Sequence, residues 1–117
     1  MPKRKLDPLP SAAFQILLAL ADEERHGYGI MRQIEQQSAG RMRLGPGTLY
    51  SSIQTLLEEK LIEEVEPPRG EESAASERRR TYRLTGGGRK LARSEADRLA
   101  DLLRIARARR IFRGEYV

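Results

Sequence analysis

The chain has 117 residues, enough for one small domain, and it contains no cysteine and a single histidine. These counts exclude a disulfide framework, a thiol nucleophile and a cysteine-ligated zinc, and His26 alone cannot hold a metal, so we expect no metal and no other cofactor. The longest apolar run, from Ile16 to Ala21, is too short to span a membrane. The first ten residues lack the apolar stretch of a signal peptide, which predicts a cytoplasmic protein.

The net charge of +5 is spread unevenly along the chain. Residues 1–40 hold five basic and five acidic side chains, residues 41–77 hold four and eight, and residues 78–117 hold thirteen and four. A basic excess of this size is typical of a protein that binds a polyanion, but a solvated helix surface gives similar counts. Charge alone leaves both interpretations open.

The first predicted helix covers residues 11–24, with Ser11 after Pro10 as a candidate N-cap. Its apolar residues form two stripes at helical spacing. The first stripe consists of Phe14, Leu17, Leu18 and Ala21, and the second of Ala13, Ile16 and Leu20. A helix that is apolar on two sides is buried on two sides. We expect one stripe to face the domain core and the other to face a further surface, such as a second subunit.

Two more helices are expected before any substantial strand. A turn at Gly27 starts the second helix, and Gly40 ends it. Residues 41–44 are too short for more than one edge strand. The third helix runs from Pro46 to about Glu59, and its buried stripe consists of Leu49, Ile53, Leu56 and Leu57.

The second half of the chain predicts a β-ribbon followed by a long helix. Residues 61–68 alternate as a strand does and end at two prolines, and residues 69–77 are a polar loop. Residues 78–85 alternate again and should return antiparallel beside the first strand. From Thr85 to about Phe112 the pattern is that of a helix with leucines on one face and basic residues on the other.

Three short helices followed by a two-stranded ribbon are the plan of a winged helix-turn-helix, a mainly helical fold whose third helix enters the major groove of DNA. The stretch "GPGTLY" at residues 45–50 fits this function, because the first turn of a helix attracts phosphate. Pro46 costs no hydrogen bond there, Gly47 allows close approach to the backbone, and the Tyr50 hydroxyl can meet a phosphate. The alternative is an ordinary loop before a helix, with Tyr50 as a packing residue.

The outward face of the third helix carries no arginine or lysine. It consists of Thr48, Ser51, Thr55 and Glu58, with Ser52 and Gln54 at its flanks. Bases would therefore be read through hydroxyl groups, through Gln54 to adenine, or through DNA shape. Glu58 and Glu59 would be repelled by phosphate, so the helix should enter the groove with its amino end first.

Phosphate affinity would then come from basic residues elsewhere. The arginines of the returning strand are Arg78, Arg79, Arg80 and Arg83, and further candidates are Lys3, Arg4, Lys5, Arg41 and Arg43. A ribbon whose arginines are merely solvated is the alternative.

Three motifs in this order resemble the PadR family of bacterial transcriptional regulators. They are "HGYGI" at residues 26–30, "GPGTLYSSIQTLLEEKLI" at residues 45–62 and "RRRTYRLTGGGRK" at residues 78–90, and the resemblance covers about residues 9–110. It implies a winged-helix domain, a homodimer built by the C-terminal helix, and repression relieved by a ligand or signal of unknown identity. The DNA-facing positions that it implies are Tyr28, Gly47, Thr48, Tyr50 and the basic wing. Members usually have glycine where Lys60 stands, so a left-handed Lys60 would cost about 1 kcal/mol.

The apolar face of the last helix independently predicts pairing of two chains, because so small a module leaves it no other cover than the spare stripe of the first helix. An intramolecular helical hairpin is the alternative. The expected interface consists of Ile16, Leu20, Leu91, Leu99, Leu102, Leu103 and Ala106. The predicted organisation is a basic arm (residues 1–10), a winged-helix domain (residues 11–85) and a dimerisation helix (residues 86–113).

No motif of an enzyme is present in the sequence: there is no nucleophile elbow and no Walker-type phosphate loop, and the glycines at 86–88 follow a ribbon strand. The sequence therefore predicts a homodimeric, double-stranded DNA-binding regulator. A winged-helix module that binds another protein or RNA is the alternative function.

Overall fold

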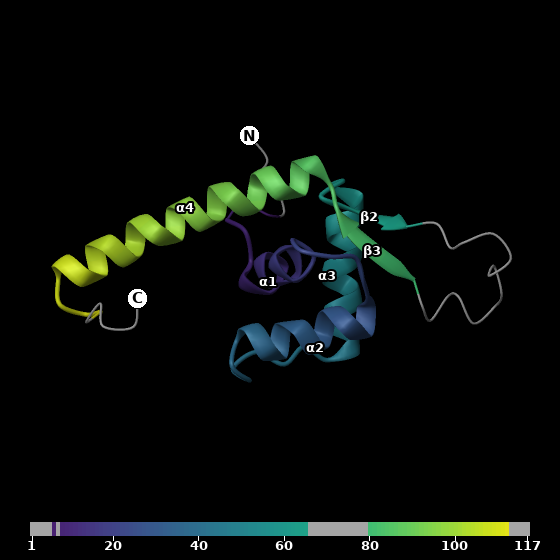
Figure 1. Ribbon diagram of the computed structural model, residues 1–117, viewed down its shortest axis with the longest axis horizontal. Coiled ribbons are helices and arrows are strands. Elements are labelled where there is room, and N and C mark those ends of the chain that lie inside the picture. Colours follow the sequence, from purple (N-terminus) through teal and green to yellow (C-terminus); the bar gives the residue numbers. More distant parts are fainter. Residues whose placement is uncertain (1–5, 7, 66–79, 113–117) are drawn as a thin grey trace, which may run out of the picture.

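The computed structural model of the chain describes residues 6, 8–65 and 80–112. Within them the order of elements is α1 (Ser11–Ala19), β1 (Arg25–His26), α2 (Gly27–Gln37), α3 (Pro46–Glu58), β2 (Ile62–Val65), β3 (Thr81–Leu84) and α4 (Gly86–Ala108), as Figure 1 shows. Helices α1 to α3 gather on one side of a small sheet, and α4 runs outward from it. The expected winged-helix fold, mainly helical with a small β-ribbon, is confirmed. None of the described helices is long and apolar enough to cross a membrane.

Helix α1 lies at the centre of the helical layer, where it contacts α2, α3 and α4. Each neighbouring helix turns one apolar stripe toward it, as the helical periodicity predicts. The largest fully buried side chains are Ile16, Leu17, Ile30, Ile34, Leu49, Ile53, Leu56 and Ile62. This single cluster fixes α3 against the body of the domain, so that only one face of α3 is left for solvent.

The prediction that Ile16 and Leu20 face a second subunit is wrong. Ile16 is completely buried and Leu20 is 2% exposed within one chain, because α2, α3 and α4 surround α1 on nearly all sides. The exposed apolar residue of α1 is Leu18, at 40%, which the sequence pattern assigned to the other stripe. Ser11 is also not the N-cap, since α1 starts at Ser11 and Pro10 precedes it without a side-chain cap.

The sheet has three strands in the order β1-β3-β2, and both pairs are antiparallel. The expected pairing of β2 with β3 is confirmed, with Glu64 opposite Tyr82. The edge strand is not residues 41–44 but the two-residue β1, where His26 lies opposite Thr81. The Thr81 hydroxyl and His26 Nδ1 are 2.9 Å apart, so a side-chain hydrogen bond supports this short pairing.

Hydrogen bonds connect the end of α3 to the start of α4. Lys60 has a φ of 61°, so the residue after α3 adopts the left-handed conformation. The Thr85 hydroxyl donates a hydrogen bond to the Lys60 carbonyl oxygen (2.8 Å) and accepts one from the Gly88 amide (3.0 Å), so Thr85 is the N-cap of α4. Arg89 adds a hydrogen bond to the carbonyl oxygen of Ala21 (3.0 Å). The direction in which α4 leaves the domain is therefore fixed at its first turn.

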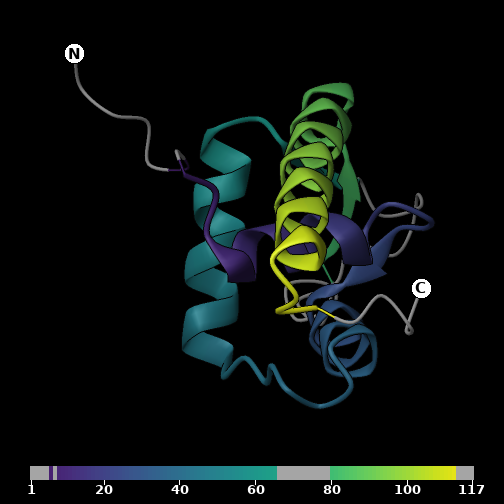
Figure 2. The same cartoon turned by 90° about the vertical axis from the view of Figure 1, so that its left-hand side faces the viewer.

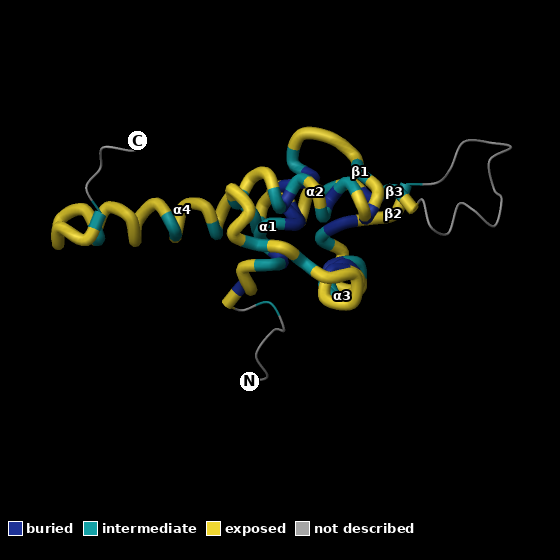
Figure 3. The backbone as a smooth tube through the Cα atoms, turned by 90° about the horizontal axis from the view of Figure 1, so that it is seen from below, coloured by how far each residue is buried: buried dark blue, intermediate teal, exposed yellow. Residues whose placement is uncertain are grey.

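Most of the surface of α4 is not buried by other described residues. Leu91 packs on the core cluster, but Leu102, Leu103 and Ile105 are each about half exposed. Figure 3 shows the outer part of α4 as exposed and intermediate residues only, well away from the body of the domain. A helix of 23 residues that buries so little of its apolar surface lacks a partner for that surface.

Candidate nucleic-acid interface

The amino end of α3 is open to solvent. Gly45 precedes the helix without a side-chain cap, and Pro46 occupies its first turn. If a Cβ atom were added at Gly45 or Gly47, no described atom would lie within 4 Å of it, apart from the neighbouring residues in the sequence and the backbone of the same helix. The first amide groups of a helix have no partner within it, and the space beside Gly45 and Gly47 leaves the start of α3 accessible, which is the arrangement that attracts an anion.

This open end lies where the loop from α2 enters α3 (Figure 2). The wing, which contains strands β2 and β3, follows the other end of the helix. Glu58 and Glu59 are at that other end and are exposed. The carboxylates are thus separated from the open turn by the length of the helix.

The outward face of α3 is polar and is partly as predicted. Thr48, Ser51 and Gln54 are exposed, whereas Ser52 and Thr55 are only half-exposed. The Thr55 hydroxyl donates a hydrogen bond to the carbonyl oxygen of Ser51 (3.2 Å). Gln54, expected at a flank, is therefore more available to a ligand than Thr55, which was expected at the centre.

Two tyrosines are exposed near the amino ends of α2 and α3. Tyr28, in the first turn of α2, is 62% exposed, and Tyr50, in the second turn of α3, is 47% exposed. The edge of the Tyr50 ring lies against Gly27, the residue before Tyr28. The Tyr50 ring of α3 therefore lies against the residue of α2 that precedes Tyr28.

The described arginines of the wing are paired with carboxylates. Arg80 contacts Glu64 at 3.3 Å, and Arg83 donates a hydrogen bond to Glu63 at 2.7 Å. The hydrogen bond to Glu63 raises the pKa of Arg83, with the charge of Glu63 adding to it. Arg78 and Arg79 lie outside the described residues. Phosphate attraction by Arg80 is thus reduced by a neighbouring negative charge.

Sequence reasoning missed one cation beside the tyrosines. The Arg32 guanidinium lies over the Tyr28 ring, 5.9 Å from its centre, in cation–π geometry. The spacing of four residues on one helix could have predicted it. Of the two basic residues before α3, Arg43 pairs with Glu35 at 3.3 Å, and Arg41 is exposed without an ion-pair partner among the described residues.

The residues expected to pair two chains lie along α4. Leu91 and Leu99 are half-buried, Leu102 and Leu103 are 48% and 51% exposed, and Ala106 is half-buried. Ile105 and Ile111, at 49% and 82%, were not singled out from the sequence. They extend the apolar surface beyond the stripe that the helical spacing predicted.

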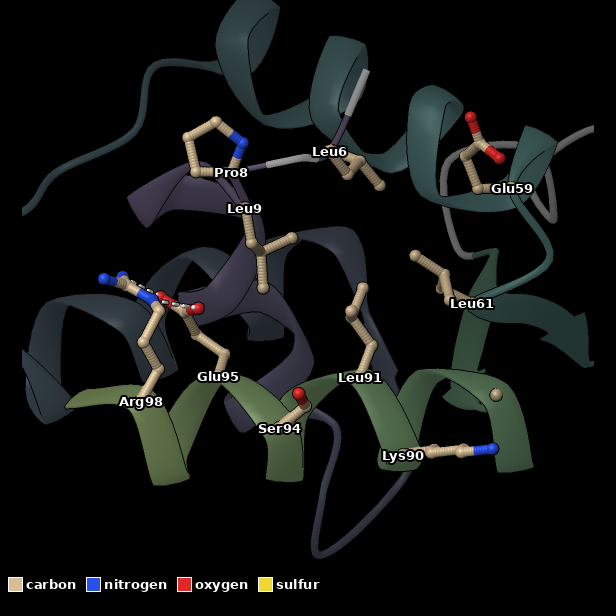
Figure 4. A pocket seen from close by; sticks show the side chains of 11 residues that line it. Leu6, Pro8, Leu9, Glu59, Leu61, Lys90, Leu91, Ser94, Glu95 and Arg98 are labelled. Carbon is tan, nitrogen blue, oxygen red and sulfur yellow. Dashed lines mark hydrogen bonds and ion pairs between the residues drawn. The ribbon is translucent and has the colours of Figure 1, made fainter. Parts of the chain in front are cut away.

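A cavity of about 640 Å³ lies between the N-terminal segment, the carboxyl end of α3 and the first turns of α4 (Figure 4). Its apolar lining comes from Leu6, Pro8, Leu9, Leu61 and Leu91. At one end Arg98 donates hydrogen bonds to both carboxylate oxygens of Glu95, at 2.8 and 2.5 Å, and these bonds lower the pKa of Glu95. The cavity is thus at the opposite end of α3 from Gly47 and separate from the open turn.

Comparisons with known proteins identify relatives of the chain. A curated relative from Streptomyces fradiae, named an uncharacterized 37.1 kDa protein in transposon Tn4556, is 38% identical over 91 residues. The match covers 78% of this chain but only 24% of the relative. This chain therefore spans about a quarter of the length of that protein.

Solved structures share the fold. A PadR family transcription regulator from Clostridium difficile aligns with a TM-score of 0.69 at 19% identity, over 85% of this chain and 97% of that one. A transcriptional regulator from Clostridium thermocellum aligns with a TM-score of 0.67 at 21% identity, over 82% and 89%. A transcription factor from Bacteroides fragilis, described as PadR-like, reaches 0.62 at 23% identity, over 82% and 86%.

The family model named transcriptional regulator PadR-like family matches residues 16–94, which include the end of α1, all of α2 and α3, strands β1 to β3 and the start of α4. The resemblance seen in the three sequence motifs is thereby confirmed. The chain belongs to the PadR-like family of transcriptional regulators, which are DNA-binding proteins and not enzymes.

Proposed function

We propose that this regulator is a cytoplasmic homodimer that binds double-stranded operator DNA through the amino end of α3, as a repressor that a ligand or signal releases. The observation that carries the proposal is the open first turn of α3. Gly47 is exposed. Apart from its neighbours in the sequence and the backbone of its own helix, no described residue lies within 4 Å of the position that a Cβ atom would take. A sugar-phosphate chain can therefore approach the unpaired amides closely.

In this proposal α3 enters the major groove with its amino end first. The amides of its first turn and the Tyr50 hydroxyl bind the DNA backbone, and Tyr28 contacts it from the start of α2. These contacts fix the position of the helix but carry no sequence information. Glu58 and Glu59 remain away from the phosphates because they lie at the other end of α3.

Bases are then read by short polar side chains. Thr48, Ser51 and Gln54 are the exposed members of the outward face, with Ser52 and Thr55 beside them. Gln54 can pair with adenine in the major groove through two hydrogen bonds. With no arginine on this face, the remaining specificity comes from DNA shape.

Basic residues around α3 supply the general attraction to phosphate. Arg41 is exposed and lies before α3, and Arg32 lies beside Tyr28. The wing adds Arg80 and, outside the described residues, Arg78 and Arg79. The basic arm at residues 1–10 is a further contributor.

Residues 11–85 bind DNA in this proposal, and residues 86–113 pair the subunits. In a symmetric dimer the outer part of each α4 covers apolar surface of its partner, and the rigid start of α4 sets the distance between the two α3 helices. Leu91, Leu99, Leu102, Leu103 and Ala106 form the interface. In this interface the exposed Leu18 is the contribution of α1, in place of Ile16 and Leu20, which are buried within the chain.

The test is a duplex-binding titration across salt concentration, with DNA from the promoter regions beside the gene. Specific binding should show a steep loss of affinity with salt and a preference for one duplex over a scrambled one. Replacing Tyr50 by Phe should weaken binding about tenfold, the scale of one hydrogen bond to a charged group. Tight binding to single-stranded RNA, with no affinity for any duplex at low salt, would instead favour the RNA-binding alternative.

A further inference from the structure

We propose that Gly27 is a positioning residue for DNA binding: it leaves open the space in which the Tyr50 ring lies, and a side chain there would move the Tyr50 hydroxyl away from its place beside the start of α2. The inference rests on the proposed function, because it takes Tyr50 as a DNA contact.

The two residues are in direct contact across the helix-turn-helix. A Cβ built on Gly27 would lie 2.6 Å from the Tyr50 hydroxyl oxygen, 3.0 Å from Cζ and 3.1 Å from Cε1. Real Cβ atoms do not approach other atoms as closely as the first of these distances. The outer edge of the Tyr50 ring therefore occupies the volume that any other residue at position 27 would need.

Nothing in the backbone requires glycine at this position. Gly27 is the first residue of α2, and among the described glycines Gly40 is the one with a positive φ. Alanine is a better helix former than glycine at such a position. The contact with Tyr50 is thus the feature that distinguishes Gly27 from its neighbour Gly29, where an added Cβ would meet Arg25 Cβ at an ordinary 3.6 Å.

The overlap would be relieved by moving Tyr50 and not by unfolding the chain. The atoms in the way are the far end of a side chain that is 47% exposed, so the ring has solvent into which it can rotate. Ile30 and Ile34, which hold α2 in the core, lie three and seven residues after Gly27 and are completely buried. A substitution at Gly27 should therefore change the position of the Tyr50 hydroxyl and leave the fold intact.

The experiment compares Gly27→Ala with the matched control Gly29→Ala, each alone and together with Tyr50→Ala. Affinity for a promoter duplex and the thermal unfolding midpoint are measured for the full chain. Gly27→Ala should weaken duplex binding about tenfold while its unfolding midpoint stays at or above that of the wild type. Gly29→Ala should bind as the wild type does. In the Tyr50→Ala background, Gly27→Ala should have no further effect on affinity.

Each other outcome overturns the inference. If Gly27→Ala binds like Gly29→Ala, the glycine does not position the tyrosine. If it weakens binding equally with and without Tyr50, position 27 acts on DNA directly. If it lowers the unfolding midpoint well below that of Gly29→Ala, the contact is structural. Failure of the proposed function would look different, because the wild-type chain would then bind no duplex at all.

Discussion

The carbonyl oxygen of Leu61 lies so close to the α-carbon of Gly88 that a Cβ added at Gly88 would overlap it. The same carbonyl oxygen accepts a hydrogen bond from the Thr85 amide at 3.1 Å. One peptide group after α3 thus determines where α4 begins. If α4 pairs the subunits, this contact also sets the separation of the two DNA-binding helices.

Replacing Gly88 by Ala should destabilise the chain by about 3 kcal/mol, because backbone lies on one side of the new methyl group and Leu84 Cδ1, at 2.7 Å, on another. Gly86→Ala is the matched control, because no described atom lies within 4 Å of its added Cβ, apart from the neighbouring residues in the sequence and the backbone of the same helix. Urea unfolding of both variants measures the difference. Equal stability of the two variants would show that α4 can shift at no cost.

Lys60→Gly should stabilise the chain by about 1 kcal/mol, because glycine adopts the left-handed conformation at Lys60 (φ 61°) without strain. Lys60→Ala removes the same charged side chain but keeps the Cβ, so it should bring no gain. Chemical denaturation checks both. A gain of equal size in both variants would assign the effect to the lysine charge and not to the backbone.

Local features of the site were predictable from sequence because they depend on a few neighbouring residues. The order of Gly45, Pro46 and Gly47 before an apolar stripe predicts an open helix start, and the glycine that family members usually have in place of Lys60 marks a position where a left-handed residue could follow the helix. The helical stripe of α3 also predicts which of its residues are buried, and Leu49, Ile53 and Leu56 are buried as expected. None of these inferences needs a distant partner.

Features that depend on distant parts of the chain were not predictable. The two apolar stripes of α1 show that it is buried on two sides, but they do not say whether its own chain or a partner covers each side, and the prediction for Ile16 and Leu20 failed there. Strand β1 has two residues and is recognisable only from its pairing with β3. The contact between Gly27 and Tyr50 likewise joins separate helices, and no spacing rule predicts it.

Glu64→Gln should strengthen duplex binding, because it removes the carboxylate that contacts Arg80 at 3.3 Å and leaves that guanidinium for phosphate. One additional phosphate contact should make the dependence of log affinity on log salt steeper by about one unit. Asp101→Asn is the control, since it changes the charge equally and breaks a similar pair with Arg104 on α4, away from the wing. Binding that is unchanged by Glu64→Gln would show that Arg80 makes no contact with DNA.

Leu102→Asp should dissociate the proposed dimer. Leu102 is 48% exposed in the single chain, and its burial by a partner would place an unpaired carboxylate in an apolar interface at a cost of about 3 kcal/mol, or roughly a hundredfold in the dissociation constant. Ala108→Asp introduces the same charge about 120° around α4 from Leu102, outside the predicted stripe, and should leave the dimer intact. Sedimentation of both variants measures the assembly, and circular dichroism checks that the helices remain. A Leu102→Asp chain that still sediments as a dimer would place the subunit interface elsewhere, and the spacing of the two α3 helices would then have to be set by a surface other than α4.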